Sequence, residues 1–317
     1  QERLADRLAE ITGMDRVFFG NSGAEAIECA LKICRLVGHA RGQDNPGVIV
    51  MEHSFHGRTL AALSATGSRK VQAGFEPLVG GFVRAPFGDA EAVRTIAQRR
   101  GDISAILLEP IQGEAGIRVA PPGYLAALRA VCDAHGWLLI VDEIQSGLCR
   151  TGRWYAHQHE GVLPDILTTA KALANGLPVG ACVARGAAAE AFTPGRHGST
   201  FGGNPLVTRT ACTVLDIMRA EDLAGRAAHT GAGMLESFRR RLGSHPAVRD
   251  VRGRGLMIGI ELDRDVNQLK QAALQRGLLI NVTQDKVIRL LPPLIIDPAQ
   301  AEQIVEGVCA LIDELDG

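Results

Sequence analysis

The chain lacks an excess of charge of either sign, because its 34 basic and 35 acidic residues nearly cancel. Without a basic face, we expect neither nucleic acids nor anionic membranes as partners. The chain also lacks long apolar runs. The longest are of strand length, far short of a membrane span, so no membrane segment is predicted. The start carries no signal-peptide pattern.

Patterns typical of disulfide frameworks and metal sites are also missing. The seven cysteines form no Cys-x-x-Cys pair and stand mostly in apolar surroundings, which is typical of reduced core thiols in a cytosolic protein. His53 and His56 are close together, but no third ligand follows at metal-site spacing, so we expect no metal. Gln1 is not a natural initiator and the residues after it resemble the middle of a helix, so we expect a piece without its own N-terminus.

Short apolar runs alternate with helical patterns over the first two thirds of the chain. This alternation predicts an α/β fold with a mainly parallel sheet whose ligands bind beyond the carboxyl ends of its strands. One amphipathic helix is expected over Tyr124–His135. The predicted strands are Val48–Met51, Ile103–Leu108, Trp137–Val141 and Val179–Val183.

The pattern changes near Pro205, where a long helical stretch runs to Arg241. A shorter βαβ-like portion follows it, and we interpret this part as a smaller α+β domain. The predicted domains are therefore residues 1–210 and residues 211–317. Within the second, we expect strands at Leu256–Glu261, Leu278–Val282 and Val287–Leu291 and a closing helix at Ala299–Leu315.

Lysine is scarce, with five in 317 residues, and one of them stands out. Lys171 lies in a nearly uncharged stretch in which Asp165 is the other ionisable residue. An ammonium without a nearby countercharge is costly to bury, so burial of Lys171 would make its neutral amine more accessible, as a Schiff-base lysine requires. Upstream, Asp142 ends an apolar strand. Proteins hold pyridoxal phosphate with a lysine and an acid of this kind. A lysine that merely ends a core helix is the alternative.

Two segments have the composition of anion-binding loops. In 21–25, Ser22 and Glu25 fit a capping box, and Gly23 lets backbone N–H groups approach a phosphate at the helix N-terminus. A plain well-capped helix is the alternative. The segment 197–205 is a second glycine-rich loop with two hydroxyls, and either a turn or a second phosphate contact explains it.

Two arginines stand where a carboxylate partner is expected. In 53–59, Phe55 is placed to stack on a planar cofactor, and Arg58 to grip a carboxylate through its planar fork. Arg289 lies inside an apolar strand and needs an anionic partner. Glu114 is one candidate for that partner, and a substrate carboxylate is the other.

In order and spacing, these segments resemble the class III, fold-type I pyridoxal-phosphate aminotransferases, most closely the acetylornithine/ornithine branch. The resemblance covers essentially the whole chain. Its stretches are Phe18–Ala26, Ser54–Leu60, Leu108–Glu114, Val141–Gly147, Leu167–Leu173 and Gly198–Pro205.

The resemblance implies a role for each matching residue. Lys171 would form the Schiff base and shuttle the proton, and Asp142 would keep the cofactor's pyridine nitrogen protonated. Arg58 and Ser199 would contact substrate, and Arg289 would take a carboxylate with Glu114 as its gate. The remaining cofactor contacts would be Phe55 and Ile144 on the two ring faces, Gln145 on the phenolic oxygen, Gly23 and Ala24 on the phosphate, and Thr200 on the phosphate of a neighbouring subunit in a homodimer.

The resemblance further implies transfer of the terminal amino group of N-acetylornithine to 2-oxoglutarate, by a ping-pong mechanism that serves arginine biosynthesis. Ornithine, succinylornithine, succinyl-diaminopimelate and 4-aminobutyrate remain alternative donors. A truncated, non-catalytic family member is the alternative from another class. The chain departs from the family at its start and at Ile27. It also departs at Ala174–Asn175, where the family usually has a glycine pair.

Overall fold

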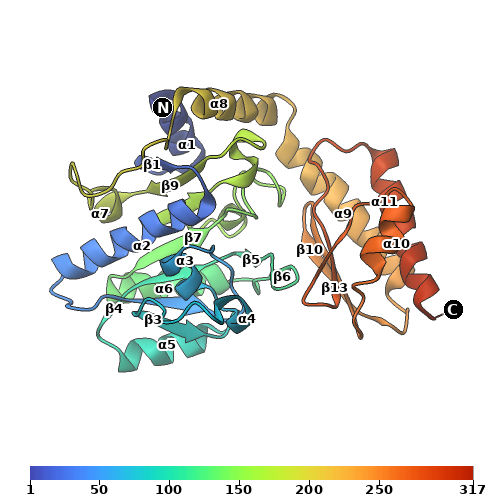
Figure 1. The fold of residues 1–317 in the computed structure, drawn as a ribbon, viewed down its shortest axis with the longest axis horizontal. Coiled ribbons are helices and arrows are strands. Elements are labelled where there is room, and N and C mark those ends of the chain that lie inside the picture. Colours follow the sequence, from blue (N-terminus) through green and yellow to red (C-terminus); the bar gives the residue numbers. More distant parts are fainter. Residues whose placement is uncertain (317) are drawn as a thin grey trace. The chain divides into compact units, whose positions relative to one another are not determined.

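The computed structural model describes residues 1–316, which form two compact units (Figure 1). The first unit contains residues 1–110, 120–148 and 155–220. Of the described residues, the second contains 111–119, 149–154 and 221–316. Within the described part of the chain, no helix is both long and apolar enough to cross a membrane.

A seven-stranded sheet forms the centre of the first unit, in the order β1-β9-β8-β7-β4-β2-β3. The neighbours from β8 to β3 pair in parallel, which confirms the mainly parallel α/β fold. The strand predicted at Val179–Val183 is present as β9, but it runs antiparallel to both β8 and β1. The strands are β1 (Arg16–Gly20), β2 (Gly47–Met51), β3 (Phe82–Ala85), β4 (Ile103–Leu108), β7 (Leu138–Asp142), β8 (Ile166–Thr169) and β9 (Gly180–Ala184).

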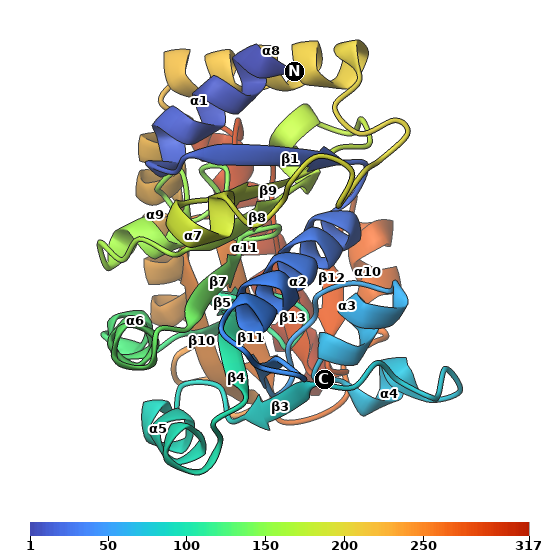
Figure 2. The same ribbon diagram turned by 90° about the vertical axis from the view of Figure 1, so that its left-hand side faces the viewer.

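Helices cover both faces of this sheet, as its continuously apolar strands require (Figure 2). Alternate residues of each strand point to opposite faces: Ile140 packs into the core beneath α2, and its neighbours Leu139 and Val141 pack into the core beneath α6. The helices of this unit are α1 (Glu2–Thr12), α2 (Gly23–Ala40), α3 (Leu60–Ala65), α4 (Arg69–Gln72), α5 (Ala90–Arg99), α6 (Tyr124–His135), α7 (Gly186–Ala189) and α8 (Pro205–Ala220), with the 3-10 helices η1 (Ala156–His159) and η2 (Lys171–Ala174).

The single helix predicted from Pro205 to Arg241 is wrong, because the chain breaks between α8 and α9 (Leu223–Leu242). Asp222 takes a left-handed conformation, with φ 44°, and its carboxylate accepts the N–H of Gly225. This capping bond starts a new helix where apolar periodicity alone predicts continuation.

The second unit is built on a four-stranded sheet in the order β10-β11-β13-β12. All its pairings are antiparallel, so the βαβ-like arrangement expected here is not formed. Apolar residues of α9 and α11 share one core with this sheet. Its elements are β10 (Val248–Arg254), β11 (Met257–Leu262), α10 (Leu269–Gln275), β12 (Asn281–Thr283), β13 (Val287–Leu290), α11 (Pro298–Asp313), η3 (Glu314–Asp316) and the small hairpin of β5 (Ile111–Gln112) and β6 (Arg118–Val119).

Candidate active site

The segments that follow the carboxyl ends of β2, β4, β7 and β8 meet the N-terminus of α2 around one cavity of about 480 Å³. This is the edge at which open α/β sheets bind ligands, and the volume is in the range of about 300–1,000 Å³ found for ligand pockets. Every lining residue belongs to the first unit. The residues singled out from the sequence that line it are Gly23, Ala24, Phe55, Arg58, Asp142, Ile144, Gln145 and Lys171.

Four other residues singled out from the sequence do not line this cavity. Ser199 accepts a hydrogen bond from Asn21 Nδ2, at 3.2 Å, and so contacts a residue of the wall. Thr200 beside it is exposed. Glu114 and Arg289 belong to the second unit, where Arg289 Nη1 lies 2.6 Å from Glu114 Oε1. This contact confirms Glu114 as a partner of Arg289.

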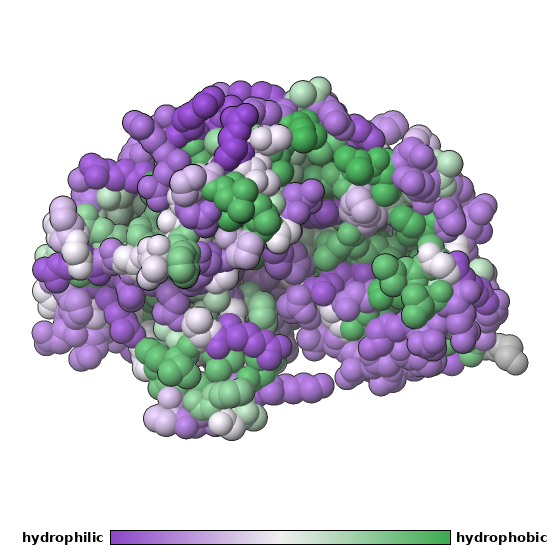
Figure 3. All heavy atoms as spheres, turned by 45° about the horizontal axis from the view of Figure 1, so that its top comes forward, coloured by the Kyte–Doolittle hydropathy of each residue, from purple (hydrophilic) through white to green (hydrophobic). Residues whose placement is uncertain are grey.

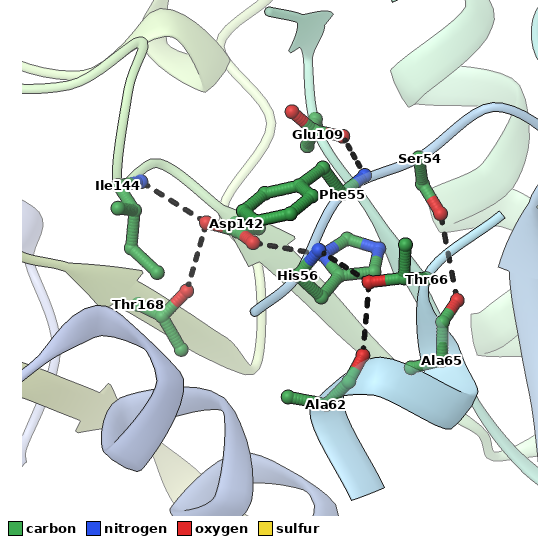
Figure 4. Close-up of polar contacts among 10 residues, drawn as sticks. All are labelled: Ser54, Phe55, His56, Ala62, Ala65, Thr66, Glu109, Asp142, Ile144 and Thr168. Atoms are coloured by element: carbon green, nitrogen blue, oxygen red, sulfur yellow. Dashed lines mark hydrogen bonds and ion pairs between the residues drawn. The ribbon is translucent and has the colours of Figure 1, made fainter. Parts of the chain in front are cut away.

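Asp142 is buried at the end of β7 and is held by three donors (Figure 4). The ring nitrogen Nδ1 of His56 lies 2.8 Å from Oδ2. The N–H of Ile144 and the hydroxyl of Thr168 donate to Oδ1 at 3.1 and 3.3 Å. These three contacts fix the orientation of the carboxylate in the cavity wall.

His56 is the counterpart of Asp142 on the loop after β2. Its side chain is buried, and Nδ1 is the ring nitrogen that contacts Asp142. Its other ring nitrogen, Nε2, is buried without a partner among residues 1–316. Within the described residues, no group of three or more His, Cys, Asp or Glu side chains is arranged to hold a metal ion. The contact at Nδ1 makes His56 a partner of Asp142.

Lys171 lies in the cavity wall two residues after β8. The prediction that it is shielded by burial is wrong, because the residue is exposed. Its backbone has φ 47°, a left-handed conformation that a lysine adopts at some cost and that is often found at functional sites. Asn175 ends η2 with the same φ, so at the place of the family's usual glycine it keeps a left-handed turn.

The N-terminus of α2 presents backbone donors to the cavity. Ser22 caps the helix by accepting the N–H of Glu25 at 3.2 Å, as predicted. The Glu25 carboxylate accepts the N–H of Asn21 at 2.7 Å. In a standard capping box it would accept the N–H of the N-cap, which is the next residue, Ser22. Gly23 and Ala24 are the first helical positions, whose N–H groups have no partner within the helix. These groups and the helix dipole favour a bound phosphate.

Two glycines allow this turn to pack closely. A Cβ on Gly23 would lie 2.8 Å from Cδ1 of Ile144, which lines the same cavity. A Cβ on Gly180 in β9 would lie 2.1 Å from the carbonyl oxygen of Ser22. The backbone contact at Gly180 leaves no room for a side chain, and a side chain on Gly23 would require Ile144 to shift.

The loop between β2 and α3 supplies the aromatic wall. The guanidinium carbon of Arg58 lies 5.9 Å from the centre of the Phe55 ring, within the range of a cation–π contact. The N–H of Phe55 donates to Glu109 Oε1 at 2.9 Å. Glu109 is buried and lines the cavity.

Glu143 anchors the turn that carries Ile144 and Gln145. Its carboxylate, 1% exposed, accepts from the Ser146 hydroxyl at 2.6 Å, from the N–H groups of Ala156 and His157, and from His157 Nδ1 at 3.0 Å. Burial alone would raise the pKa of the Glu143 carboxyl, but the hydrogen bonds from His157 and Ser146 outweigh it, and the pKa is lowered.

The sequence reasoning missed two residues of this site. Glu109 follows an apolar strand just as Asp142 ends one, so the same strand-end signal was present. His56 was considered only as a metal ligand. Its contact with Asp142 joins residues 86 positions apart, and such a pairing becomes visible only when β2 and β7 are placed in one sheet.

A mainly parallel sheet with a buried acid at one strand end, a lysine beyond the next and a helix N-terminus beside them defines a fold-type I pyridoxal-phosphate enzyme. The chain belongs to the class-III aminotransferases, whose family model matches residues 1–312. It is 55% identical to an acetylornithine aminotransferase of Nitrosomonas europaea over 312 residues, which are 98% of this chain and 79% of that protein. It is therefore a pyridoxal-phosphate-dependent transaminase.

Solved structures agree with this assignment. An ornithine aminotransferase of Toxoplasma gondii superposes with a TM-score of 0.96 and 36% identity, covering 99% of this chain and 76% of that one. A second structure of the Toxoplasma enzyme, with a TM-score of 0.94 and 36% identity over 98% of this chain and 75% of that one, contains pyridoxal phosphate at partial occupancy in its active site.

The cavity of this chain fits the cofactor by its donor set. Asp142 offers a buried carboxylate for the pyridinium nitrogen, Lys171 an amine for the aldehyde, and Gly23 and Ala24 N–H groups for the phosphate. Among the described residues, three chemically distinct ends of the cofactor thus have matching partners in one cavity.

Proposed function

We propose that the chain transfers the terminal amino group of N-acetylornithine to 2-oxoglutarate in a ping-pong reaction. The observation that carries this proposal is the cavity shared by Lys171, Asp142 and the first turn of α2, with Arg58 beside it. The relative from Nitrosomonas europaea, named an acetylornithine aminotransferase, supports the choice of donor. N-acetylation leaves this donor with one reactive amine and one carboxylate. A guanidinium such as that of Arg58 binds carboxylates.

Pyridoxal phosphate, when bound, supplies an aldehyde that condenses with amines and a ring that withdraws electrons from the adjacent carbon. In our proposal, Asp142 would hold the ring nitrogen through its carboxylate, and His56 would fix the position of that carboxylate through the contact at Nδ1. Lys171 would hold the cofactor's aldehyde through its amine, and the same amine would carry the proton that the amino donor gives up.

The other lining residues orient the reacting groups. Phe55 and Ile144 are proposed to contact opposite faces of the ring, and Gln145 its phenolic oxygen, while Gly23 and Ala24 bind the phosphate through N–H groups. These contacts would hold the ring within reach of the amine of Lys171. Orientation of this kind lowers the entropic part of the barrier.

Arg289 is proposed to bind a second carboxylate. Its ion pair with Glu114, at 2.6 Å, occupies the guanidinium when the donor has one carboxylate, and 2-oxoglutarate would displace Glu114. Ser199 is proposed as a further substrate contact. Ornithine, succinylornithine, succinyl-diaminopimelate and 4-aminobutyrate also carry a terminal amine. The residues that contact the reacting amine therefore do not distinguish these donors from N-acetylornithine.

We further propose a homodimer in which Thr200 contacts the phosphate of the partner's cofactor. Large apolar side chains are exposed on the first unit, as expected for a surface that another chain covers. Figure 3 shows apolar patches interrupting the polar surface. Phe201, next to Thr200, is 71% exposed, and Leu206 is 68% exposed. The reduced state of the seven cysteines fits a cytoplasmic location.

Absorbance spectra test the proposed reaction. Purified protein supplied with pyridoxal phosphate is expected to show the visible band of the lysine-bound cofactor, and borohydride should bleach it. Lys171→Ala is expected to lose the band, whereas Lys70→Ala, a matched change at an exposed lysine of α4, keeps it. N-acetylornithine should bleach the band and 2-oxoglutarate restore it.

A panel of donors then separates the alternatives. A response to ornithine or 4-aminobutyrate without one to N-acetylornithine would replace the proposed donor. Protein that gains no band from added cofactor would make this chain a non-catalytic member of the family.

A further inference from the structure

The loop Phe55–Thr59 carries three groups of the proposed site: the ring of Phe55, the imidazole of His56 and the guanidinium of Arg58. It connects β2 to α3 with little secondary structure of its own. A loop that must present three groups at fixed positions needs anchors outside itself, since loops are otherwise the most mobile part of a fold.

Glu109 anchors the first end of the loop. It stands directly after β4, is 6% exposed, and accepts the N–H of Phe55 on Oε1 at 2.9 Å (Figure 4). A charged acceptor makes a stronger hydrogen bond than a neutral one, and burial removes competing water. The position of the Phe55 backbone, from which the ring extends into the cavity wall, is thus tied to the central sheet.

Glu28 anchors the other end from the middle of α2. Its Oε1 accepts the hydroxyl of Thr59 at 2.5 Å and the N–H of Ala62 at 3.3 Å. Thr59 is the N-cap of α3, but its own side chain caps no helix N–H. Glu28 therefore performs the capping function from a neighbouring helix, and it holds the residue next to Arg58.

The middle of the loop rests on the start of α2. Gly57 has φ 134°, and a Cβ there would lie 2.9 Å from Cβ of Ala24. Ala24 is a proposed phosphate-binding residue, so the loop and the phosphate turn are packed as one body. Because Glu109 and Glu28 hold the two ends of the loop, we expect a change at either glutamate to shift the loop relative to the cavity.

We propose that Glu109 and Glu28 are positioning residues for the two functions of this loop. Glu109 fixes the position of the Phe55 ring and thereby raises the affinity for the cofactor. Glu28 fixes the position of Arg58 and thereby raises the affinity for substrate carboxylates. Neither residue takes part in proton transfer. The proposal concerning Glu28 rests on the proposed function, because it assigns a substrate carboxylate to Arg58, whereas the one concerning Glu109 needs only the cofactor.

The cofactor end is tested by the dissociation constant of pyridoxal phosphate, measured by titration of the apoprotein. Glu109→Ala removes the acceptor and is expected to weaken binding about tenfold or more. Glu109→Gln keeps an oxygen for the Phe55 N–H and should restore most of the affinity. Equal affinity in Glu109→Ala and the wild type, with both folded by circular dichroism, would overturn this assignment.

The substrate end is tested on cofactor-loaded protein. Glu28→Ala is expected to raise KM for N-acetylornithine about tenfold with kcat changed by less than about threefold, since ground-state binding is lost while Lys171 is untouched. Glutarate, a dicarboxylate that cannot react, should bind the variant about tenfold more weakly in calorimetry. Glu28→Gln retains the acceptor and should recover both values.

A double-mutant cycle shows whether Glu28 acts through Thr59. Thr59→Val removes the hydroxyl, and in Glu28→Ala/Thr59→Val the effects on KM should be clearly less than additive. Glu91→Ala, which removes an exposed, paired glutamate of α5, is the matched control and should leave KM unchanged. A lower melting temperature with unchanged KM in Glu28→Ala would reduce Glu28 to a structural cap and refute the proposal. Wild-type protein that responds to no amino donor would instead refute the proposed function, and the titration of Glu109→Ala would still stand.

Discussion

His56 shows how a single side chain prepares an acid for the cofactor. Asp142 is 4% exposed, and burial of a carboxylate without donors disfavours its charged form. The imidazole is itself buried and gives Asp142 its shortest contact, 2.8 Å. Asp142 and His56, which both line the cavity, thus form one hydrogen-bonded pair.

Replacing His56 tests this pairing. His56→Leu removes the donor at similar volume, and we expect a loss of roughly 2 kcal/mol in cofactor binding, or more than tenfold in the dissociation constant. His56→Asn places an amide N–H near the position of Nδ1 and should lose far less. Fluorescence titration with pyridoxal phosphate measures both. Equal affinities for the two variants would show that the donor at Nδ1 does not matter.

At the scale of elements, the sequence reasoning succeeded where strands are continuously apolar. Ile103–Leu108 and Tyr124–His135 were predicted with the bounds that the structure has. β1, β3 and β8 were missed. β1 and β3 are the edge strands of the sheet and only partly buried, and β8 mixes apolar residues with threonines.

The periodicity of apolar residues does not predict the direction of a strand. β9 is as apolar as the parallel strands of the sheet and shows the same pattern in the sequence. Its direction is set by the chain returning across the sheet from β8 to pair with β1. The site was predictable where motif residues lie at strand ends and unpredictable where contacts span the sheet, as for His56 and Asp142.

Glu143 links β7 to the helix η1, and its titration predicts a pH-dependent stability. Its pKa is lowered in the folded chain, so its contribution is fully present above the ordinary carboxyl value, about 4.3. The contribution is lost as the pH falls through the lower, folded value. We expect Glu143→Gln to reduce the free energy of unfolding by roughly 2 kcal/mol at neutral pH, with the deficit shrinking below about pH 4.

Urea unfolding of wild type and Glu143→Gln at several pH values measures that difference. Glu91→Gln, at an exposed position, should show no comparable change. A deficit that stays constant or widens in acid would contradict the lowered pKa.

At the scale of the whole molecule, both units keep their cysteines inside. All seven are free and buried, five in the first unit and Cys149 and Cys309 in the second. Burial raises the pKa of the Cys132 and Cys149 thiols to about 12 and raises that of Cys309 as well. Since the thiolate is the reactive form, two independent barriers, access and ionisation, protect these side chains.

We therefore expect native protein at neutral pH to react very slowly with a chromogenic disulfide reagent, whereas unfolded protein shows all seven thiols at once. Ala73→Cys places a thiol at an exposed position after α4 and should add one rapidly reacting group, which establishes that the reagent is not limiting. Because the reaction of a buried thiol requires the chain around it to open, its rate in dilute urea reports the stability of the unit that holds it. Mapping the labelled peptides then assigns each rate to one unit. Rapid labelling of any native cysteine without urea would show that its surroundings open far more readily than the packing indicates.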